Sequence, residues 1–143
     1  MLLFAASRAQ LVREKIQPAL ARGAVVILDR FLDSTTVYQG IARGLPMESV
    51  RAINDFAVGA MRPHLTLVLD LPCEIGQERI RTTGRELDRM ESQPLAFFEK
   101  VRQGYLGLAA QEPERIAVID ASLTIEQVEA QITTLVEGRL HAL

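Results

Sequence analysis

Cysteine and histidine are scarce in this sequence, which narrows the kinds of site it can hold. The 143 residues include one cysteine, Cys73, and two histidines, His64 and His141. A single cysteine excludes an internal disulfide framework and a cysteine-based zinc site. The two histidines are too few and too far apart to suggest a metal site. We therefore expect neither a disulfide-stapled fold nor a zinc centre.

Long apolar runs and a strong net charge are also absent. No run approaches the roughly 20 residues of a membrane helix, and residues 1–6 lack the basic start of a signal peptide. The net charge is −2, from 16 basic and 18 acidic residues, so the chain has no overall attraction to nucleic acid or to an anionic membrane. We expect a cytoplasmic protein without a nucleic-acid or membrane partner.

Helical and strand patterns alternate along the chain. Apolar residues recur at helical spacing over residues 5–22, 46–59, 94–110 and 125–140. Continuous apolar runs, typical of strands covered on both faces of a parallel sheet, occupy residues 24–28, 65–71 and 116–120. The alternation predicts an α/β fold, a three-layer parallel sheet with flanking helices, in a single domain over residues 1–143.

Two local signals mark helix ends. Gly23 follows the first helical pattern and predicts a C-cap there. Thr124 and Gln127 have the spacing of a capping box, which predicts the start of the last helix.

Each predicted strand ends in an aspartate: Asp29, Asp70 or Asp120. Ligands of open α/β sheets bind beyond the carboxyl ends of the strands, but an aspartate in that place often only caps the next turn. For Asp70 and Asp120 we favour the capping interpretation. Asp29 differs because a dense polar segment follows it.

That segment, residues 29–40, combines charges with directional hydrogen-bonding groups. A buried acid or arginine is costly unless it is paired or used. The planar fork of Arg30 suits a phosphate, whereas Asp29 suits a Mg²⁺-bound water or a backbone group. Ser34, Tyr38 and Gln39 carry groups of the kind that read a base or sugar edge. A polar helix N-terminus would explain Ser34 alone, but the whole run predicts a binding site.

A second charged cluster lies at residues 79–93, the least regular stretch of the chain. Its arginines are Arg79, Arg81, Arg85 and Arg89. A solvated helix face with surface ion pairs explains such a cluster as well as a site does. Phosphoryl transfer, however, needs cations on the developing charge, commonly from a closing segment. Nucleic-acid binding is disfavoured by the net charge and by the lack of interleaved aromatic residues.

In order and spacing, these segments resemble the thymidylate kinase family. Asp29-Arg30-Phe31, then Ser34 and Tyr38-Gln39-Gly40, is similar to the signature after that family's third strand. The likeness covers essentially the entire chain, and its other segments are residues 4–10, 42–45, 62–70, 84–91, 102–106 and 119–122. The resemblance implies a P-loop nucleoside monophosphate kinase fold. It also implies Mg²⁺-dependent transfer of the γ-phosphoryl group of ATP to dTMP, which gives dTDP for dTTP synthesis.

The resemblance also implies roles in binding the nucleoside. Phe4 would stack on thymine, and Arg8 and Gln39 would read the base edge with support from Ser34. Tyr38 would lie against the deoxyribose, where a ring excludes a 2′-hydroxyl.

For the phosphate and the reaction, the resemblance implies a different set. Arg30 would hold the dTMP phosphate, and Asp29 would act on Mg²⁺ indirectly. Residues 79–93 resemble the family's lid, in which Arg85 and Arg89 are the catalytic candidates because Gly84 provides a hinge beside them. Homodimerisation is a further implication, with the helix over residues 5–22 as a candidate face.

The sequence contains no Gly-x-x-x-x-Gly-Lys-Ser/Thr run, the loop that cradles donor phosphates in such kinases. We therefore expect a family member truncated at its N-terminus and inactive as this chain alone. The alternative is a non-catalytic dTMP-binding or scaffold protein derived from the kinase. A kinase for another monophosphate is disfavoured because Phe4, Arg8, Tyr38 and Gln39 occur together.

The missing loop also bears on the predicted sheet. In this family the strand before that loop lies between the strands that correspond to residues 24–28 and 65–71. Without it, both strands have unpaired edges, which carry an energetic cost. Three outcomes stay open: the two strands pair directly, another chain supplies a strand, or the chain is a piece of a longer gene product.

Overall fold

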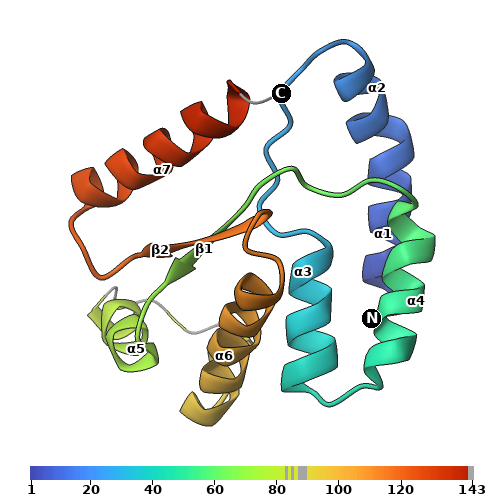
Figure 1. Ribbon diagram of the computed structural model, residues 1–143. Coiled ribbons are helices and arrows are strands. Elements are labelled where there is room, and N and C mark those ends of the chain that lie inside the picture. Colours follow the sequence, from blue (N-terminus) through green and yellow to red (C-terminus); the bar gives the residue numbers. More distant parts are fainter. Residues whose placement is uncertain (83, 85, 87–89, 142–143) are drawn as a thin grey trace. The chain divides into compact units, whose positions relative to one another are not determined.

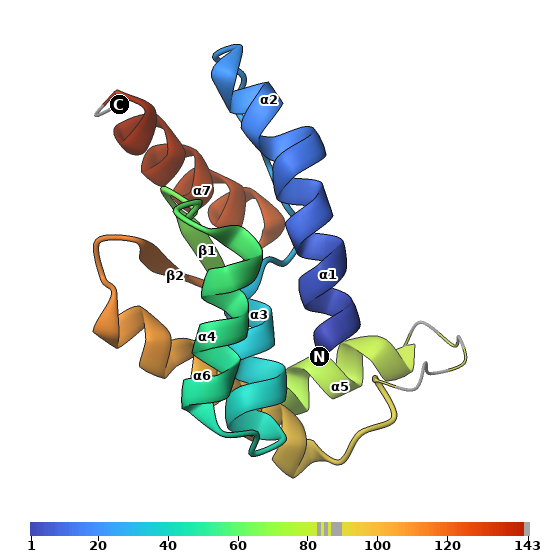
Figure 2. The same ribbon diagram turned by 90° about the vertical axis from the view of Figure 1, so that its right-hand side faces the viewer.

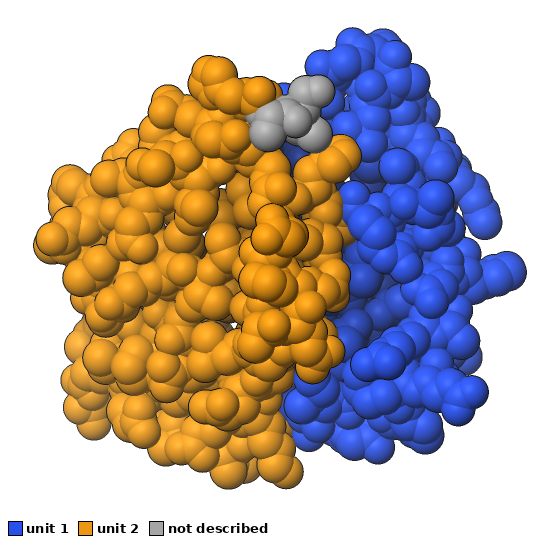
Figure 3. All heavy atoms as spheres, viewed as in Figure 1, with its two compact units in different colours: residues 1–62 blue, residues 63–143 orange. Residues whose placement is uncertain are grey.

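The computed structural model describes residues 1–82, 84, 86 and 90–141, and its elements are labelled in Figure 1. The chain divides into two compact units, Met1–Arg62 and Pro63–Leu143 (Figure 3). The single domain over residues 1–143 stays a prediction. Arg85 and Arg89 of the predicted lid lie outside the described residues.

All regular elements that the structure describes in the first unit are helices. It begins with α1 (Leu2–Leu11), continues through the π-helical segment η1 (Val12–Ile16) and ends this run with α2 (Gln17–Ala21). These three elements follow one another without a break and confirm the helix expected over residues 5–22. The later elements are α3 (Leu32–Thr35), the π-helical η2 (Thr36–Ala42) and α4 (Met47–Val58).

Gly23 ends the first helical run as expected. Its φ is 76°, a left-handed conformation that favours glycine. The Gly23 N–H donates to the Leu20 carbonyl at 2.9 Å, and the Ala24 N–H donates to the Ala19 carbonyl at 3.1 Å. This pair of bonds is a Schellman motif, which satisfies two carbonyls that the helix end would otherwise leave unpaired.

The strand predicted over residues 24–28 is wrong, because these residues form no strand. A strand is stabilised by hydrogen bonds to a neighbouring strand, and the described residues pair only β1 with β2. Two of the apolar side chains that suggested a buried strand are largely exposed, at 70% for Val25 and 90% for Ile27. Val26 packs against the core of the first unit, but no described strand pairs with the run.

The core of the first unit lies between the first helical run and α4, which run side by side in both views (Figures 1 and 2). Helical spacing places apolar side chains of both segments on their facing sides. The buried members of this core are Ala5, Val12, Ile16, Leu32, Ala57 and Val58. This packing holds α1, α4 and the start of α3 together, which positions the side chains described below.

The second unit is an α/β arrangement. Its elements in chain order are β1 (Thr66–Asp70), α5 (Cys73–Thr82), α6 (Leu95–Gln111), β2 (Ile116–Asp120) and α7 (Ile125–Leu140). The strands are parallel, with Thr66 opposite Ile116 and Asp70 opposite Asp120. α6 and α7 flank the strands on different sides (Figures 1 and 2). Parallel strands with covering helices agree with the predicted α/β class, whereas the full three-layer sheet stays an expectation.

The start of α7 confirms the predicted capping box. The Thr124 hydroxyl accepts from the Gln127 N–H, and the Gln127 side chain accepts from the Thr124 N–H. These reciprocal bonds satisfy two donors at the helix start.

Candidate functional site

The guanidinium of Arg8 joins separate elements of the first unit. It extends from α1 and donates from Nη1 to Asn54 Oδ1 at 3.1 Å. Its Nη2 donates to Thr35 Oγ1 at 2.7 Å and to the Phe31 carbonyl at 3.3 Å. Arg8 thus links α1 to α4 and to both ends of α3.

Burial and charge act on Arg8 in opposite directions. Burial lowers the pKa of Arg8, and the nearby carboxylate of Asp33 partly opposes this. An arginine stays protonated in proteins even so, so a full positive charge lies half-buried here. The ring of Phe31 lies 5.6 Å from the guanidinium carbon, a cation–π distance that further favours the charge.

The guanidinium of Arg8 retains donors for a ligand. It has five N–H groups, and its described partners use three of them, one on Nη1 and two on Nη2. The N–H on Nε and the second one on Nη1 have no hydrogen-bond partner among the described residues. These two donors suit an acceptor atom such as a carbonyl oxygen of a base.

Arg30, the predicted phosphate ligand, has an unusual backbone. Its φ is 65°, and it is the only non-glycine residue with a positive φ in the described part of the chain. Such a conformation is costly for a side chain with a Cβ and gathers at binding and active sites. The guanidinium carbon lies 5.2 Å from the ring centre of Tyr38. The structure therefore brings two predicted site residues, Arg30 and Tyr38, into contact.

Tyr38 and Gln39 both lie on the π-helical η2, and Ser34 lies on α3 directly before it. All three side chains are half-buried. A π-helical segment shifts the direction in which successive side chains point, and such segments are frequent at functional sites. The segment around the predicted site thus departs from regular helix geometry twice, in the π-helical winding of residues 36–42 and in the positive φ of Arg30.

Two predicted site residues are not joined to the others. Phe4 is 61% exposed on α1, and Asp29 is exposed before α3. The described residues provide neither with a side-chain hydrogen bond or a ring contact. The helix α1 places Phe4 one turn before Arg8 on the same face. An exposed ring in that position is compatible with stacking on a ligand.

Sequence reasoning missed Asn54 on α4, which is only 2% exposed. Its Nδ2 donates to the Leu32 carbonyl at 3.3 Å and to Thr36 Oγ1 at 3.1 Å, while its Oδ1 accepts from Arg8. A signal was present, because Asn54 is four residues from both Val50 and Val58 and so lies on their apolar helix face. A polar residue in such a stripe predicts a buried hydrogen-bond network.

At the strand ends, one capping interpretation is correct and one is wrong. The Asp120 carboxylate accepts from the N–H and the hydroxyl of Ser122, and these bonds lower the pKa of Asp120. It caps its turn as expected. Asp70 instead binds Arg102 of α6 through both oxygens, at 2.7 and 2.8 Å. This bidentate bond raises the pKa of Arg102. The sequence does not reveal a partner 32 residues away.

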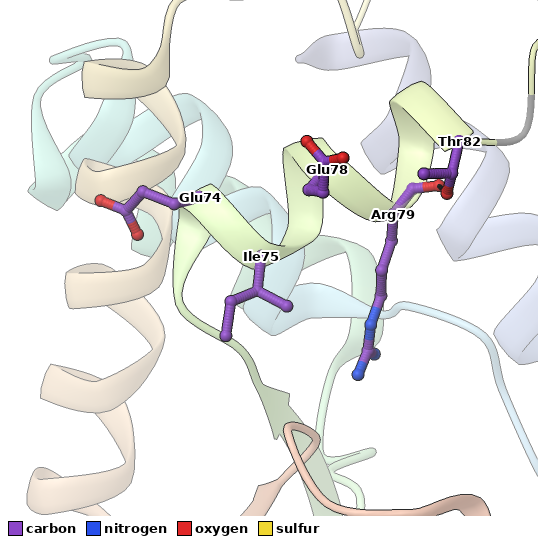
Figure 4. A pocket seen from close by; sticks show the side chains of 5 residues that line it. All are labelled: Glu74, Ile75, Glu78, Arg79 and Thr82. Atoms are coloured by element: carbon purple, nitrogen blue, oxygen red, sulfur yellow. Dashed lines mark hydrogen bonds between the residues drawn. The ribbon is translucent and has the colours of Figure 1, made fainter.

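The described part of the predicted lid begins within α5. Arg81 pairs with Glu78 at 2.7 Å, and both side chains are more than half exposed, so Arg81 fits the solvated-face interpretation. A hollow of about 410 Å³ lies along the same helix, lined by Glu74, Ile75, Glu78, Arg79 and Thr82 (Figure 4). Ile75 and Arg79 extend from the same side of α5. A hollow lined by one helix lacks the enclosing walls of a ligand site.

The described residues include no group of three His, Cys, Asp or Glu side chains placed to hold a metal ion. None of the helices in the described ranges is long and apolar enough to cross a membrane. Burial raises the pKa of the Cys73 thiol above its usual range, which keeps it protonated at neutral pH.

Comparison with known proteins adds independent information. The family profile for thymidylate kinase matches residues 1–132. A thymidylate kinase of Symbiobacterium thermophilum is 53% identical over 136 residues, which cover 95% of this chain and 63% of the relative. One from Kosmotoga olearia is 47% identical over 132 residues, which cover 92% and 63%. One from Syntrophotalea carbinolica is 51% identical over 133 residues, which cover 90% and 62%.

The chain thus spans less than two thirds of the length of these three relatives. Within that span, the matched residues include every predicted site residue from Phe4 to Arg89. A profile that matches nearly the whole chain, together with identities near one half, is decisive for kinship. The chain belongs to the thymidylate kinase family.

Proposed function

We propose that this family member serves the Mg²⁺-dependent transfer of the γ-phosphoryl group of ATP to dTMP, giving dTDP in dTTP synthesis. We further propose that the first unit, residues 1–62, holds dTMP. The observation that carries this proposal is the half-buried guanidinium of Arg8, fixed by three hydrogen bonds while two of its N–H groups keep no described partner. Keeping this positive charge half-buried costs desolvation free energy, which favours a ligand-binding role over a purely structural one.

Arg30 is proposed to bind the dTMP phosphate. Its planar fork donates two parallel hydrogen bonds to a phosphate, which gives both charge and direction. Its strained backbone supports this role, because strain at a single arginine persists when the surrounding structure holds it for a task. Contact with the Tyr38 ring orients the side chain and leaves the ring edge for the deoxyribose.

The nucleoside is proposed to be held by residues of three elements. Phe4 of α1 provides an exposed aromatic face for stacking on thymine. Arg8 and Gln39 donate to the base edge, and Ser34 supports them. Arg8 has only donors, so it selects a carbonyl oxygen over an amino group at the base position it meets.

Mg²⁺ and ATP belong to the donor side of the reaction. Mg²⁺ is held in such enzymes by one or two carboxylates together with phosphate oxygens, so an exposed carboxylate such as Asp29 fits an indirect role through water. When bound, Mg²⁺ neutralises charge on the donor phosphates. Arg85 and Arg89 are proposed to stabilise the phosphoryl group in transfer.

Catalysis of this kind relies on positioning and charge neutralisation. The described residues contribute the acceptor side, where Arg30 fixes the phosphate and Arg8 fixes the base. A protein that only binds dTMP, without turnover, is the second candidate function, because the acceptor residues suffice for it. We also propose a homodimer in the cytoplasm, with the helical run over residues 5–22 as the candidate contact face, where Leu11 is an exposed apolar residue.

Thermal unfolding with added nucleotide tests the dTMP site. A ligand at 100 times its Kd stabilises the folded state by about 2.7 kcal/mol, which corresponds to a rise in Tm of several degrees. We expect such a rise with dTMP for the 143-residue chain and none with ATP. Arg30→Ala should lower the rise by about half or more, because tenfold weaker binding leaves about 1.4 kcal/mol of stabilisation. Arg13→Ala, which removes an exposed arginine of η1, should keep the full rise. No stabilisation by dTMP would contradict the proposed site.

An assay of turnover measures what the 143-residue polypeptide does by itself. We expect negligible ADP release from dTMP and ATP by the 143-residue polypeptide in a coupled assay, because its sequence holds no donor-phosphate loop. Turnover within tenfold of ordinary kinases, which run at about 1–100 s⁻¹, would contradict this expectation.

A further inference from the structure

The buried amide of Asn54 has only one orientation that satisfies its neighbours. The Leu32 carbonyl can only accept hydrogen bonds. The Thr36 hydroxyl donates its single hydrogen to that carbonyl at 3.3 Å, so its oxygen must accept from Asn54. Both of these neighbours therefore need the Nδ2 end of the amide. The Oδ1 end must face Arg8.

This orientation limits the positions available to Arg8. Nη1 donates to Asn54 Oδ1, and Nη2 donates to two oxygens at the two ends of α3. Three bonds to a planar group fix both its position and its plane. The bond to Asn54 comes from α4 and holds Nη1. The bonds to Phe31 and Thr35 hold Nη2. Without Asn54, rotation of the guanidinium about its bonds is less restricted.

From this geometry we infer that Asn54 is a positioning residue, which aims the two remaining N–H groups of Arg8 at the base of the bound nucleotide. This inference rests on the proposed function and assigns Asn54 no contact with the ligand. Asn54 is almost fully buried, at 2% exposure, so it acts through Arg8. It determines selectivity for a 4-oxo over a 4-amino pyrimidine. An N–H of Arg8 held in the right direction donates a hydrogen bond to a 4-oxo oxygen, whereas a 4-amino group has no oxygen to accept it.

Selectivity in binding is the readout that a purely structural role would not change. The two probes are dTMP and 5-methyl-dCMP, whose base carries a 4-amino group in place of the 4-oxo group. Loss of a hydrogen bond from a charged donor lowers affinity about tenfold. We expect Asn54→Leu to reduce the preference for dTMP by about that factor. Arg8→Met should do the same, and the double variant should lose no more than either single one.

Val58→Ala is the matched control, because Val58 lies on the same helix face and is buried but makes no polar contact with Arg8. It should lower Tm and leave the preference unchanged. If Asn54→Leu does not fold, Thr36→Val removes the hydroxyl that fixes the amide and should lower the preference in the same direction. An unchanged preference in a folded Asn54→Leu or Thr36→Val protein would overturn the inference while the proposed function stands.

A measurement without ligand distinguishes failure of this inference from failure of the proposed function. In nitrogen-15 NMR spectra, a fixed Arg8 guanidinium should give separate Nη proton signals, and Asn54→Leu should merge them. If the wild-type chain binds no dTMP, the proposed function fails, and so does the selectivity role. Separate signals that persist in Asn54→Leu would show that Asn54 does not orient Arg8.

Discussion

At the scale of single residues, the first unit has one arginine whose charge is costly to bury and another whose backbone conformation is costly to adopt. Arg8 is half-buried and requires the combined oxygens of Asn54, Thr35 and the Phe31 carbonyl to remain there. Arg30 has a positive φ, which few side chains adopt. Such costly features persist when function requires them, since an apolar residue of similar size in place of a buried charge would avoid the desolvation cost.

Arg30 permits a direct test of strain. Arg30→Gly and Arg30→Ala both remove the guanidinium and its contact with Tyr38, but only alanine keeps a Cβ at a φ of 65°. We expect the glycine variant to be more stable than the alanine variant by about 1 kcal/mol, measured as free energy of unfolding in urea. Both should weaken dTMP binding by about tenfold or more. Equal stabilities would contradict the presence of strain at this position.

Residue types were easier to predict than their partners. The polar segment after residue 28 indicated Arg30 and Tyr38, which the structure brings into contact. The pairing of Asp70 with Arg102 and of Arg8 with Asn54 was not predictable, because each joins residues more than 30 positions apart. Local patterns report spacing along one element, whereas such pairs depend on how elements pack.

At the scale of elements, the helices form where local sequence signals predict them, whereas one predicted strand does not form. The Schellman motif at Gly23 and the capping box at Thr124 are formed by bonds within a few residues, so sequence alone predicts them. Residues 24–28 carry an equally strong apolar pattern but form no strand. A strand needs a partner from elsewhere, and a pattern in one segment does not reveal whether that partner is present.

The end of α4 offers a prediction about backbone conformation. Gly59 follows α4 with φ 57° and ψ −131°, and an added Cβ there would meet no atom within 4 Å. The cost of Gly59→Ala is therefore conformational, and we expect a loss of about 1–3 kcal/mol in the free energy of unfolding. Gly107→Ala, inside α6 with equally open space, should instead gain about 0.5–1 kcal/mol.

Urea unfolding of the three proteins measures both effects. The opposite signs make the comparison informative, because a general sensitivity to the added methyl group would destabilise both variants. Stabilisation by Gly59→Ala would show that the end of α4 does not need its left-handed residue.

At the scale of the whole molecule, the chain is a thymidylate kinase family member that covers less than two thirds of several relatives. The family was recognisable from the order of its motifs, although no single motif was decisive. The α/β class follows from the parallel pairing of β1 with β2. The two described strands give one pairing, and Arg85 and Arg89 lie outside the described residues, so the larger sheet and the lid roles stay predictions.

The central claim is that residues 1–62 bind dTMP through Arg8 and Arg30. The most direct test is a titration of the isotope-labelled 143-residue chain with dTMP, followed by NMR with residue-specific assignments. We predict that the largest shifts occur at Phe4, Arg8, Arg30 and residues 34–39, saturate with dTMP and are absent with ATP. Saturable shifts confined to residues 63–143, or no shifts at all, would contradict the account.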